Sequence, residues 1–173
     1  MNEIINNIVT RRSCKSFRSD MLPYETIDKI VEAGLYAASG MGKQSPIILV
    51  VTNKGIRDKL SQLNAKYDLR NRPDPFYNAP VVLSVLAPES IPTAIYDGSL
   101  VIGNMMLAAH SLDIGSCWIH RAKEVFQDEE GKKLLDDLGI TGEYEGIGNC
   151  VIGFPERTNS TIIPRRDNRV YKI

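Results

Sequence analysis

Short runs of β-branched and other apolar residues alternate along the chain with longer segments whose apolar residues recur at helical spacing. The runs predict strands at 47–52, 81–87, 116–120 and 148–154. The helical spacing predicts helices at 2–12, 23–38, 56–63, 94–112 and 129–138. Elements that alternate in this way bury their apolar faces against one another, so the pattern indicates a three-layer α/β or α+β domain.

Length and cysteine content narrow the class of protein further. A chain of 173 residues favours a single domain, residues 1–173, whose core needs no disulfide or metal. Cys14, Cys117 and Cys150 are odd in number and form no C-x-x-C pair, so we expect buried, unreactive thiols. Because the sequence has neither an apolar run long enough for a membrane span nor a signal-peptide layout, we expect a cytoplasmic protein that is not bound to membranes.

The helix expected at 94–112 is apolar on most of its sides. Such a helix is buried either within its own domain or against another subunit. Sequence alone leaves both alternatives open.

The distribution of charge is more informative than its sum. The formal net charge is zero, which argues against a general nucleic-acid binder. Residues 1–18 carry four basic and one acidic side chain, and residues 155–173 carry five basic and two acidic ones. Each end therefore carries a net charge of +3, and the middle of the chain carries the compensating negative charge. The two ends are either solvated tails or parts of one site for a small anion.

Several kinds of catalytic site are excluded by missing motifs. The chain has no G-x-x-x-x-G-K-[ST] phosphate loop, no G-x-G-x-x-G after a strand and no G-x-S-x-G elbow. Its two histidines, His110 and His120, have no partner at metal-ligand spacing, so no metal site is expected. An enzyme with this sequence has to take its reactivity from a bound cofactor.

Two segments near the N-terminus are open to a binding role and to a structural one. Arg11, Ser13 and Lys15 suit a phosphate monoester, with Arg11 and Lys15 on one face if the first helix continues through them. The alternative is that they complement the C-terminal end of the helix dipole. The turn 39–44, Ser-Gly-Met-Gly-Lys-Gln, lets backbone N–H groups approach a flat ligand, but a plain helix cap explains it equally well.

Two further segments lie in the second half of the chain. Residues 114–121, Ile-Gly-Ser-Cys-Trp-Ile-His-Arg, place the single tryptophan on a strand after a glycine turn, where core packing is the alternative. Residues 164–166, Pro-Arg-Arg, lie in a C-terminal arm without periodicity, where solvated charge is the alternative.

Five motifs in this order resemble the FMN-dependent nitroreductase family in its short form, and the resemblance runs from end to end. The motifs are Arg11-Arg12-Ser13-x-Lys15-x-Phe17, Ala38-Ser39-Gly40-Met41-Gly42-Lys43-Gln44, Phe76-Tyr77-x-Ala79-Pro80, the helix Asp97–His110 running into Gly115-Ser116-Cys117-Trp118-Ile119, and Val151-Ile152-Gly153-Phe154-Pro155 before the arm. The resemblance implies an α+β, three-layer α/β/α fold with a central mixed sheet. It also implies a homodimer with an extended C-terminal arm.

The resemblance further implies a role for individual residues toward FMN. Arg11, Ser13 and Lys15, helped by Arg12, would hold the phosphate, the ribityl chain or the near edge of the flavin. Ser39, Gly40 and Gln44 would line the ring or the ribityl chain from the partner subunit. Trp118, Ile119, His120 and Arg121 would lie behind the ring, where a backbone N–H near residue 120 or 121 would donate to flavin N5. Arg165, with Arg166 as a second candidate, would return to the phosphate.

The implied activity is hydride transfer from NADH or NADPH through flavin N5 to a nitroaromatic, a quinone or a similar small-molecule acceptor. No side chain is then required as a catalyst. The alternatives are a flavin enzyme with another substrate, such as one for enone reduction or dehalogenation, and a non-catalytic FMN-binding module. Two departures from the family pattern, Gly42 where many relatives have Asn and Ser45-Pro46 after the Gln, concern the shape of the pocket.

Overall fold

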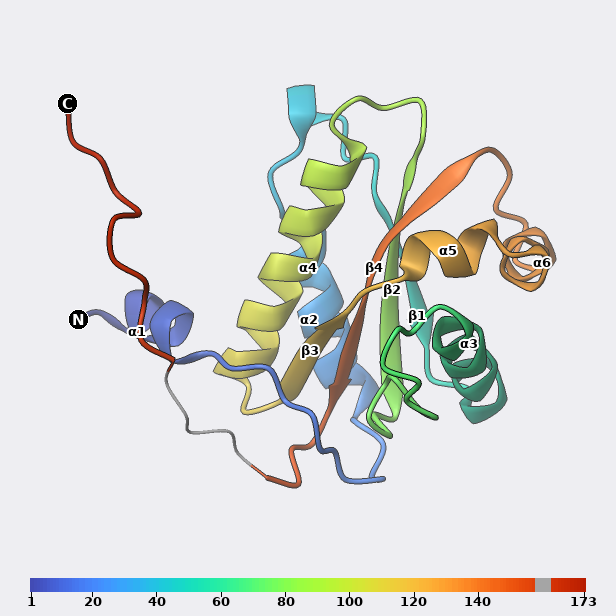
Figure 1. Ribbon diagram of the computed structural model, residues 1–173, viewed down its shortest axis with the longest axis horizontal. Coiled ribbons are helices and arrows are strands. Elements are labelled where there is room, and N and C mark those ends of the chain that lie inside the picture. The colour runs from blue at the N-terminus through green and yellow to red at the C-terminus, as the bar shows by residue number, and fades with distance from the viewer. Residues whose placement is uncertain (158–162) are drawn as a thin grey trace.

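A four-stranded sheet forms the centre of the molecule (Figure 1). The computed structural model describes residues 1–157 and 163–173. The strands lie in the order β1-β2-β4-β3, and all three neighbouring pairs are antiparallel. Their bounds are β1 Ile47–Val51, β2 Val81–Pro88, β3 Gly115–Ile119 and β4 Tyr144–Gly153.

The expectation of a mixed sheet is therefore wrong for these four strands. The pairings make β2 and β3 run in the same direction, as expected for strands joined through a helix, but β4 lies between them. Sequence patterns locate strands and not their neighbours, so they could not reveal this insertion. An isolated parallel bridge joins Ser13 to Ser116 at the β3 edge.

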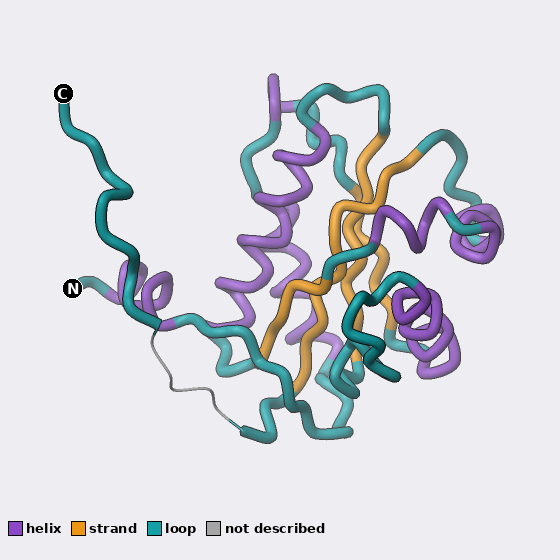
Figure 2. The backbone as a smooth tube through the Cα atoms, in the orientation of Figure 1, coloured by secondary structure: helices purple, strands orange, loops and turns teal. Residues whose placement is uncertain are grey.

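Helices cover both faces of the sheet and complete three layers (Figures 1 and 2). One face carries α2 (Tyr24–Leu35) and α4 (Ala94–Ser111), and the other carries α3 (Lys54–Lys66), α5 (Ala122–Gln127) and α6 (Glu129–Asp137). Alternate residues of β2 enter separate cores: Leu83 packs on the α2–α4 side and Val82 on the α3–α5 side. This α+β, three-layer arrangement confirms the expected fold class.

The predicted elements differ from the observed ones at α5 and at the start of β4. The six-residue helix α5 was not predicted, because it is too short to show a period. Strand β4 begins at Tyr144, four residues before the predicted start, through two glycines that weaken the strand pattern. Within the described residues, no helix combines the length and the apolarity that crossing a bilayer requires.

Helix α1 (Glu3–Thr10) stands away from the cores and buries none of its residues. It is attached to the C-terminal end of α4, where Asn7 Nδ2 donates to the Leu107 carbonyl at 3.0 Å and Thr10 Oγ1 lies 2.9 Å from His110 Nε2. Its apolar residues remain exposed, including Ile4, Ile5, Ile8 and Val9.

The first helix ends at Thr10 and does not continue through Lys15 as the face argument required. The chain becomes extended because Ser13 bridges to Ser116 and Phe17 bridges to Pro155. These pairings, one with β3 and one with the residues after β4, replace the helical hydrogen bonds. The predicted helical face shared by Arg11 and Lys15 is therefore wrong.

The C-terminal arm is exposed wherever the structure describes it, from Ile163 to Ile173. In Figure 1 both termini lie on the same side of the molecule, away from the sheet. The arm exposes four apolar side chains as well as its basic ones: Ile163, Val170, Tyr171 and Ile173.

Candidate functional site

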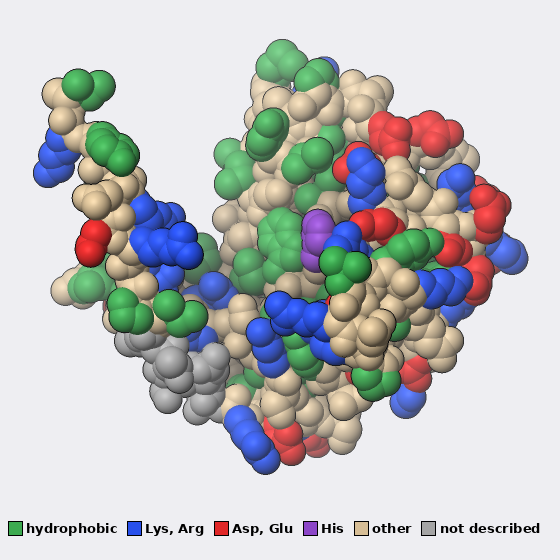
Figure 3. Space-filling model, in the orientation of Figure 1, with side chains coloured by type: hydrophobic (Ala, Val, Ile, Leu, Met, Phe, Trp, Pro, Cys, Tyr) green, Lys and Arg blue, Asp and Glu red, His purple; other side chains and the backbone are tan. Residues whose placement is uncertain are grey.

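A cavity of about 410 Å³ opens where β3 ends. Three segments meet there: the extended stretch after α1, the end of α3 with the loop that follows it, and the turn between β3 and α5. Lys and Arg side chains gather on this face of the molecule (Figure 3). The lining residues are Ser13, Lys15, Asn64, Asp68, Leu69, Arg70, Arg72, Tyr77, Cys117, Trp118, Ile119, His120 and Arg121.

The extended stretch supplies Ser13 and Lys15 to one wall. Its backbone is fixed by the Cys14 N–H, which donates to the Ser116 carbonyl at 2.9 Å. Side chains alternate in extended backbone, so Cys14 is buried while the residues on either side of it face the cavity. The sequence correctly grouped Ser13 with Lys15, but a two-residue period brings them together.

The end of β3 supplies Trp118 and Ile119, and the turn that follows supplies His120 and Arg121. Arg121 has a left-handed backbone (φ 80°), which ends the strand and starts α5. Asn64 Nδ2 donates to the His120 carbonyl at 2.9 Å and fixes the turn. Within the described part of the chain, the backbone N–H groups of His120 and Arg121 have no acceptor. These N–H groups are free for a ligand.

Glycine makes room for the tryptophan behind this turn. A Cβ on Gly148 of β4 would lie 2.8 Å from Nε1 of Trp118. The indole therefore lies close to the backbone of the neighbouring strand, and its half-buried ring forms part of the cavity wall.

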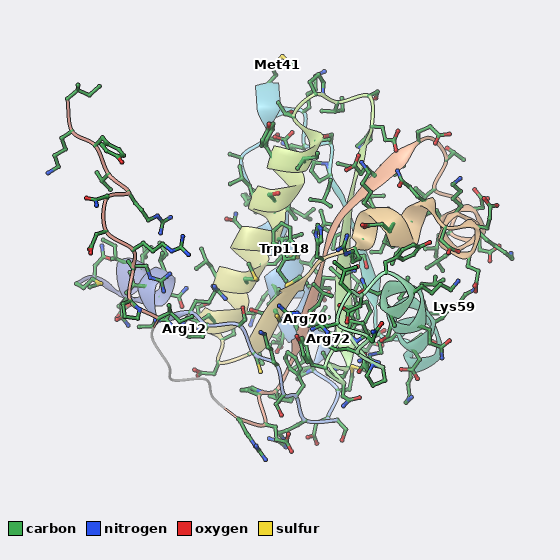
Figure 4. All side chains as sticks on the ribbon, in the orientation of Figure 1. Arg12, Met41, Lys59, Arg70, Arg72 and Trp118 are labelled. Carbon is green, nitrogen blue, oxygen red and sulfur yellow. The ribbon has the colours of Figure 1, made fainter. Side chains whose placement is uncertain are left out.

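The loop after α3 supplies a third wall that the sequence analysis missed. Arg72 Nε donates to Asp68 Oδ2 at 2.7 Å and Nη2 donates to Oδ1 at 3.1 Å, while Nη1 contacts the Tyr77 hydroxyl. These hydrogen bonds lower the pKa of Asp68 to about 2. Arg70 lines the cavity nearby, as the labelled side chains in Figure 4 show. The i,i+4 spacing of Asp68 and Arg72 was the available signal, but prolines in 70–80 indicated only a loop.

A buried ion pair fixes the next part of this loop to α3. Arg57 Nη2 donates to Asp74 Oδ2 at 2.7 Å, and Arg57 Nε donates to the Ala79 carbonyl at 3.0 Å. Burial opposes ionisation of Asp74, but the hydrogen bonds from Arg57 and Ser61 outweigh it and lower its pKa. The pair holds the segment that carries Tyr77.

Arg11 and Arg12 precede the cavity and differ in their contacts. Arg12 Nη1 donates to the carbonyls of Val9 at 2.8 Å and Arg11 at 2.6 Å, and its side chain lines a second cavity of about 170 Å³ with Thr10 and His110. Arg11 Nη1 is buried and has no hydrogen-bond partner in the described residues. Such a group costs free energy unless an acceptor reaches it.

The nearby ionisable groups do not supply a nucleophile. Burial raises the pKa of Cys117, although a hydrogen bond from Ser13 and the charge of Lys15 oppose it. Burial also raises the pKa of Cys14, and that of Cys150 to about 12. All three thiols are free and buried, as expected. Burial and then the charge of Arg11 lower the pKa of His110.

Seven of the predicted residues lie outside this cavity: Arg11 and Arg12, which precede it, and five residues of the turn and the arm. Ser39, Gly40 and Gln44 form a turn at the N-terminal end of α4, where Gly40 contacts Asp97, while the Arg12 cavity lies at the other end beside His110. His110 lies 13 positions after Asp97, so the two residues are about 20 Å apart along the helix. Figure 4 shows Met41 of this turn far from Arg12, Arg70 and Arg72. Arg165 and Arg166 lie exposed in the arm.

These features define an α+β domain with a cleft that is lined by basic side chains, by Trp118 and by backbone N–H groups without an acceptor in the described residues. The chain matches the family model described as "Nitroreductase family" over residues 8–155. It belongs to the nitroreductase family.

Individual relatives agree with this membership. A nitroreductase with bound FMN from Bacteroides fragilis is 27% identical, and the match covers 100% of both chains with a TM-score of 0.88. The "FMN reductase [NAD(P)H]" of Bacillus subtilis is 25% identical over 171 residues, or 90% of this chain and 67% of that protein. A Methanothermobacter thermautotrophicus protein, whose name includes NAD(P)H nitroreductase, is 28% identical over 120 residues. That match covers 67% of this chain and 60% of the relative.

Proposed function

We propose that the protein is an FMN-dependent oxidoreductase that takes a hydride from NADH or NADPH and passes it to a nitroaromatic, a quinone or a similar small organic acceptor. Family membership and the FMN-bound relative from Bacteroides fragilis support the cofactor. The observation that carries the proposal is the cleft that Ser13 and Lys15 line together with His120 and Arg121, whose backbone N–H groups have no acceptor in the described residues.

The residues present fit FMN. The phosphate would satisfy the buried, unpartnered Nη1 of Arg11, and Ser13 and Lys15 add a hydroxyl and an ammonium group. Arg12 would assist from the adjoining cavity. The ring would lie against Trp118 and Ile119. Bound FMN supplies the chemistry of accepting and releasing a hydride at N5.

The chain's own contribution is to bind and orient, since no side chain in the cleft is required as a general acid. A free N–H of His120 or Arg121 would donate to the N5 position. The positive charges of Lys15 and of the paired Arg72 would stabilise negative charge on the flavin ring. Charged groups stabilise an anion more strongly in a partly desolvated cleft than in water.

We also propose a homodimer. Helix α4, expected to be buried all round, exposes Ile95, Tyr96 and Leu100, and α1 exposes its whole apolar stripe. A second copy that covers these faces would bring its turn at Ser39, Gly40 and Gln44 to this cleft. Its arm would supply Arg165 or Arg166 to the phosphate. Replacing Leu100 by Glu should then lower the mass measured by light scattering to that of a monomer.

The test of function is the visible spectrum of the purified protein after incubation with FMN and gel filtration, repeated anaerobically with NADH and NADPH. Retained flavin bands that bleach, and recover when menadione or a nitroarene is added, support the oxidoreductase. Retained bands without turnover above that of free FMN would indicate a binding module. A protein that retains no FMN would overturn the proposal.

A further inference from the structure

Asp97 is a buried acidic residue that the proposed reaction does not use. It lies in the first turn of α4 and is 4% exposed. Its Oδ1 accepts the backbone N–H of Gly40 at 3.0 Å, and its Oδ2 accepts the Thr93 hydroxyl at 2.8 Å. No basic side chain in the described residues forms an ion pair with it. Both oxygens are therefore satisfied only by the turn and by Thr93, and the loss of either partner leaves a buried carboxyl oxygen unpaired.

Gly40 packs closely against the side chain of Thr93. A Cβ at residue 40 would lie 2.5 Å from Oγ1 of Thr93. The same hydroxyl is held by Asp97, so it cannot move aside without breaking its own hydrogen bond. The position therefore requires glycine for close packing, and Asp97 fixes both groups that pack together.

The turn held by Asp97, residues 39–44, is strained. Met41, Gly42 and Gln44 have φ values of 54°, 64° and 49°, which two side-chain-bearing residues adopt only at a cost. The turn closes on itself: the Gly42 N–H donates to the Ser39 carbonyl at 3.0 Å and the Gln44 N–H donates to Ser39 Oγ at 2.9 Å. A strained conformation of this kind persists only when its surroundings hold it.

Turn 39–44 has few hydrogen bonds to the rest of the fold. Among the described residues, the bond from Gly40 to Asp97 is the one hydrogen bond that joins turn 39–44 to another element. The turn nonetheless presents its outer side to solvent, with Met41 84% exposed and Gln44 also exposed. Apart from this anchor at Asp97 and Thr93, the turn forms no hydrogen bond with another element among the described residues, and its strained, exposed shape suits a contact outside its own subunit.

We propose that Asp97 is a positioning residue for the flavin site of the other subunit, because it holds turn 39–44 in the shape that completes that site. The proposal rests on the function proposed above. It assigns Asp97 no contact with the flavin or the acceptor. Its effect passes through the Gly40 N–H to the side chains of Ser39 and Gln44.

The first test compares Asp97→Ala with Ser84→Ala, which removes a buried hydrogen bond of 2.6 Å to Asn149 between β2 and β4. Both variants should lose stability. Only Asp97→Ala should weaken FMN binding, by about tenfold or more in the Kd measured by flavin fluorescence well below the melting temperature. Thr93→Val removes the hydrogen bond that Thr93 donates to Asp97, and it should weaken FMN binding severalfold. This variant takes the place of Asp97→Ala if Asp97→Ala does not fold.

Equal Kd values for wild type, Ser84→Ala and the Asp97 or Thr93 variant would overturn the proposal and leave a purely structural role. Failure of the proposed function is recognised separately, because wild-type protein would then bind no FMN. That result would overturn both proposals.

The second test asks which subunit the turn serves. Differently tagged Asp97→Ala and Arg11→Ala chains are co-expressed, and the heterodimer is isolated through both tags. If the turn acts on the partner, one site has intact Arg11 and an intact turn, so the heterodimer should bind one FMN with wild-type affinity. If it acts within its own chain, neither site is intact, and a heterodimer without a wild-type-affinity site would overturn the proposal.

Discussion

Asp68 and Arg72 form a two-point ion pair on the wall of the candidate flavin cleft, with nitrogen–oxygen distances of 2.7 and 3.1 Å. The Asp68 side chain is 8% exposed and that of Arg72 is 29% exposed, so the pair is largely shielded from water. Tyr77 contacts the same guanidinium through its hydroxyl, and its ring centroid lies 5.2 Å from the guanidinium carbon. The pair therefore fixes the position of the Arg72 guanidinium in the wall of the cleft.

Replacing Asp68 by Asn should cost about 1–2 kcal/mol of unfolding free energy, which for a chain of this size lowers the melting temperature by about 2–8 °C. The pKa of Asp68 is about 2 in the fold against an ordinary 3.8, so the stabilisation is fully present above 3.8 and is lost as the pH falls through 2. Denaturant titrations should show a constant difference between variant and wild type near neutral pH and a shrinking one below about pH 4. A difference independent of pH down to 2 would contradict the pair.

Replacing Arg11 by Ala should weaken FMN binding by about ten- to a hundredfold, since a charge-assisted hydrogen bond is worth about 1.5–3 kcal/mol. The fold should hardly change in stability, because Arg11 Nη1 is buried with no hydrogen-bond partner in the described residues. The matched control is Arg18→Ala, which removes an exposed arginine paired with Asp20 at 2.9 Å outside the cleft. Fluorescence titration should give equal Kd values for the control and wild type. An unchanged Kd in Arg11→Ala would remove the phosphate role.

Breaking the Arg57–Asp74 pair should be far more damaging than breaking an exposed pair. Arg57→Met leaves the Asp74 carboxylate, whose side chain is 22% exposed, without its cation, so the cost should lie at the lower end of the about 3–5 kcal/mol that loss of one partner of a buried pair causes. Thermal unfolding should therefore occur at least about 6 °C lower. Lys54→Met is the control: Lys54 pairs with Asp58 on the same helix, but its side chain is 87% exposed and its loss should cost less than about 1 kcal/mol.

The sequence predicted most elements because each carries its own periodicity, and it failed where tertiary contacts decide. The extended stretch after Thr10 is fixed by the bridge between Ser13 and Ser116, which lie 103 positions apart in the sequence. The same bridge, and not a helical face, places Lys15 in the cleft. The part of the cleft wall formed by Arg70 and Arg72 was not predicted, because a proline-rich loop has no hydrophobic periodicity from which side-chain positions could be inferred. Turn 39–44 was found, but a single chain cannot place it against a cleft of a second copy.

Gly42, which the sequence comparison with the family pattern singled out, gives a further prediction. Its φ of +64° is left-handed, and a Cβ there would meet nothing within 4 Å, so only backbone strain opposes a side chain. Gly42→Ala should cost about 1 kcal/mol, because alanine is strained in this region. Gly42→Asn should cost less, since asparagine tolerates left-handed backbone through local hydrogen bonds.

The FMN affinities of the two Gly42 variants complete this prediction. If turn 39–44 contacts the flavin of the partner, Gly42→Asn should bind FMN at least as tightly as wild type, because its amide adds a donor and an acceptor without changing the turn. Gly42→Ala should bind more weakly, in proportion to the distortion that its melting temperature reports. Weaker binding by Gly42→Asn at an unchanged melting temperature would show that the cleft beside the turn has closed around glycine, and that the pocket of this protein differs in shape from those of relatives with asparagine.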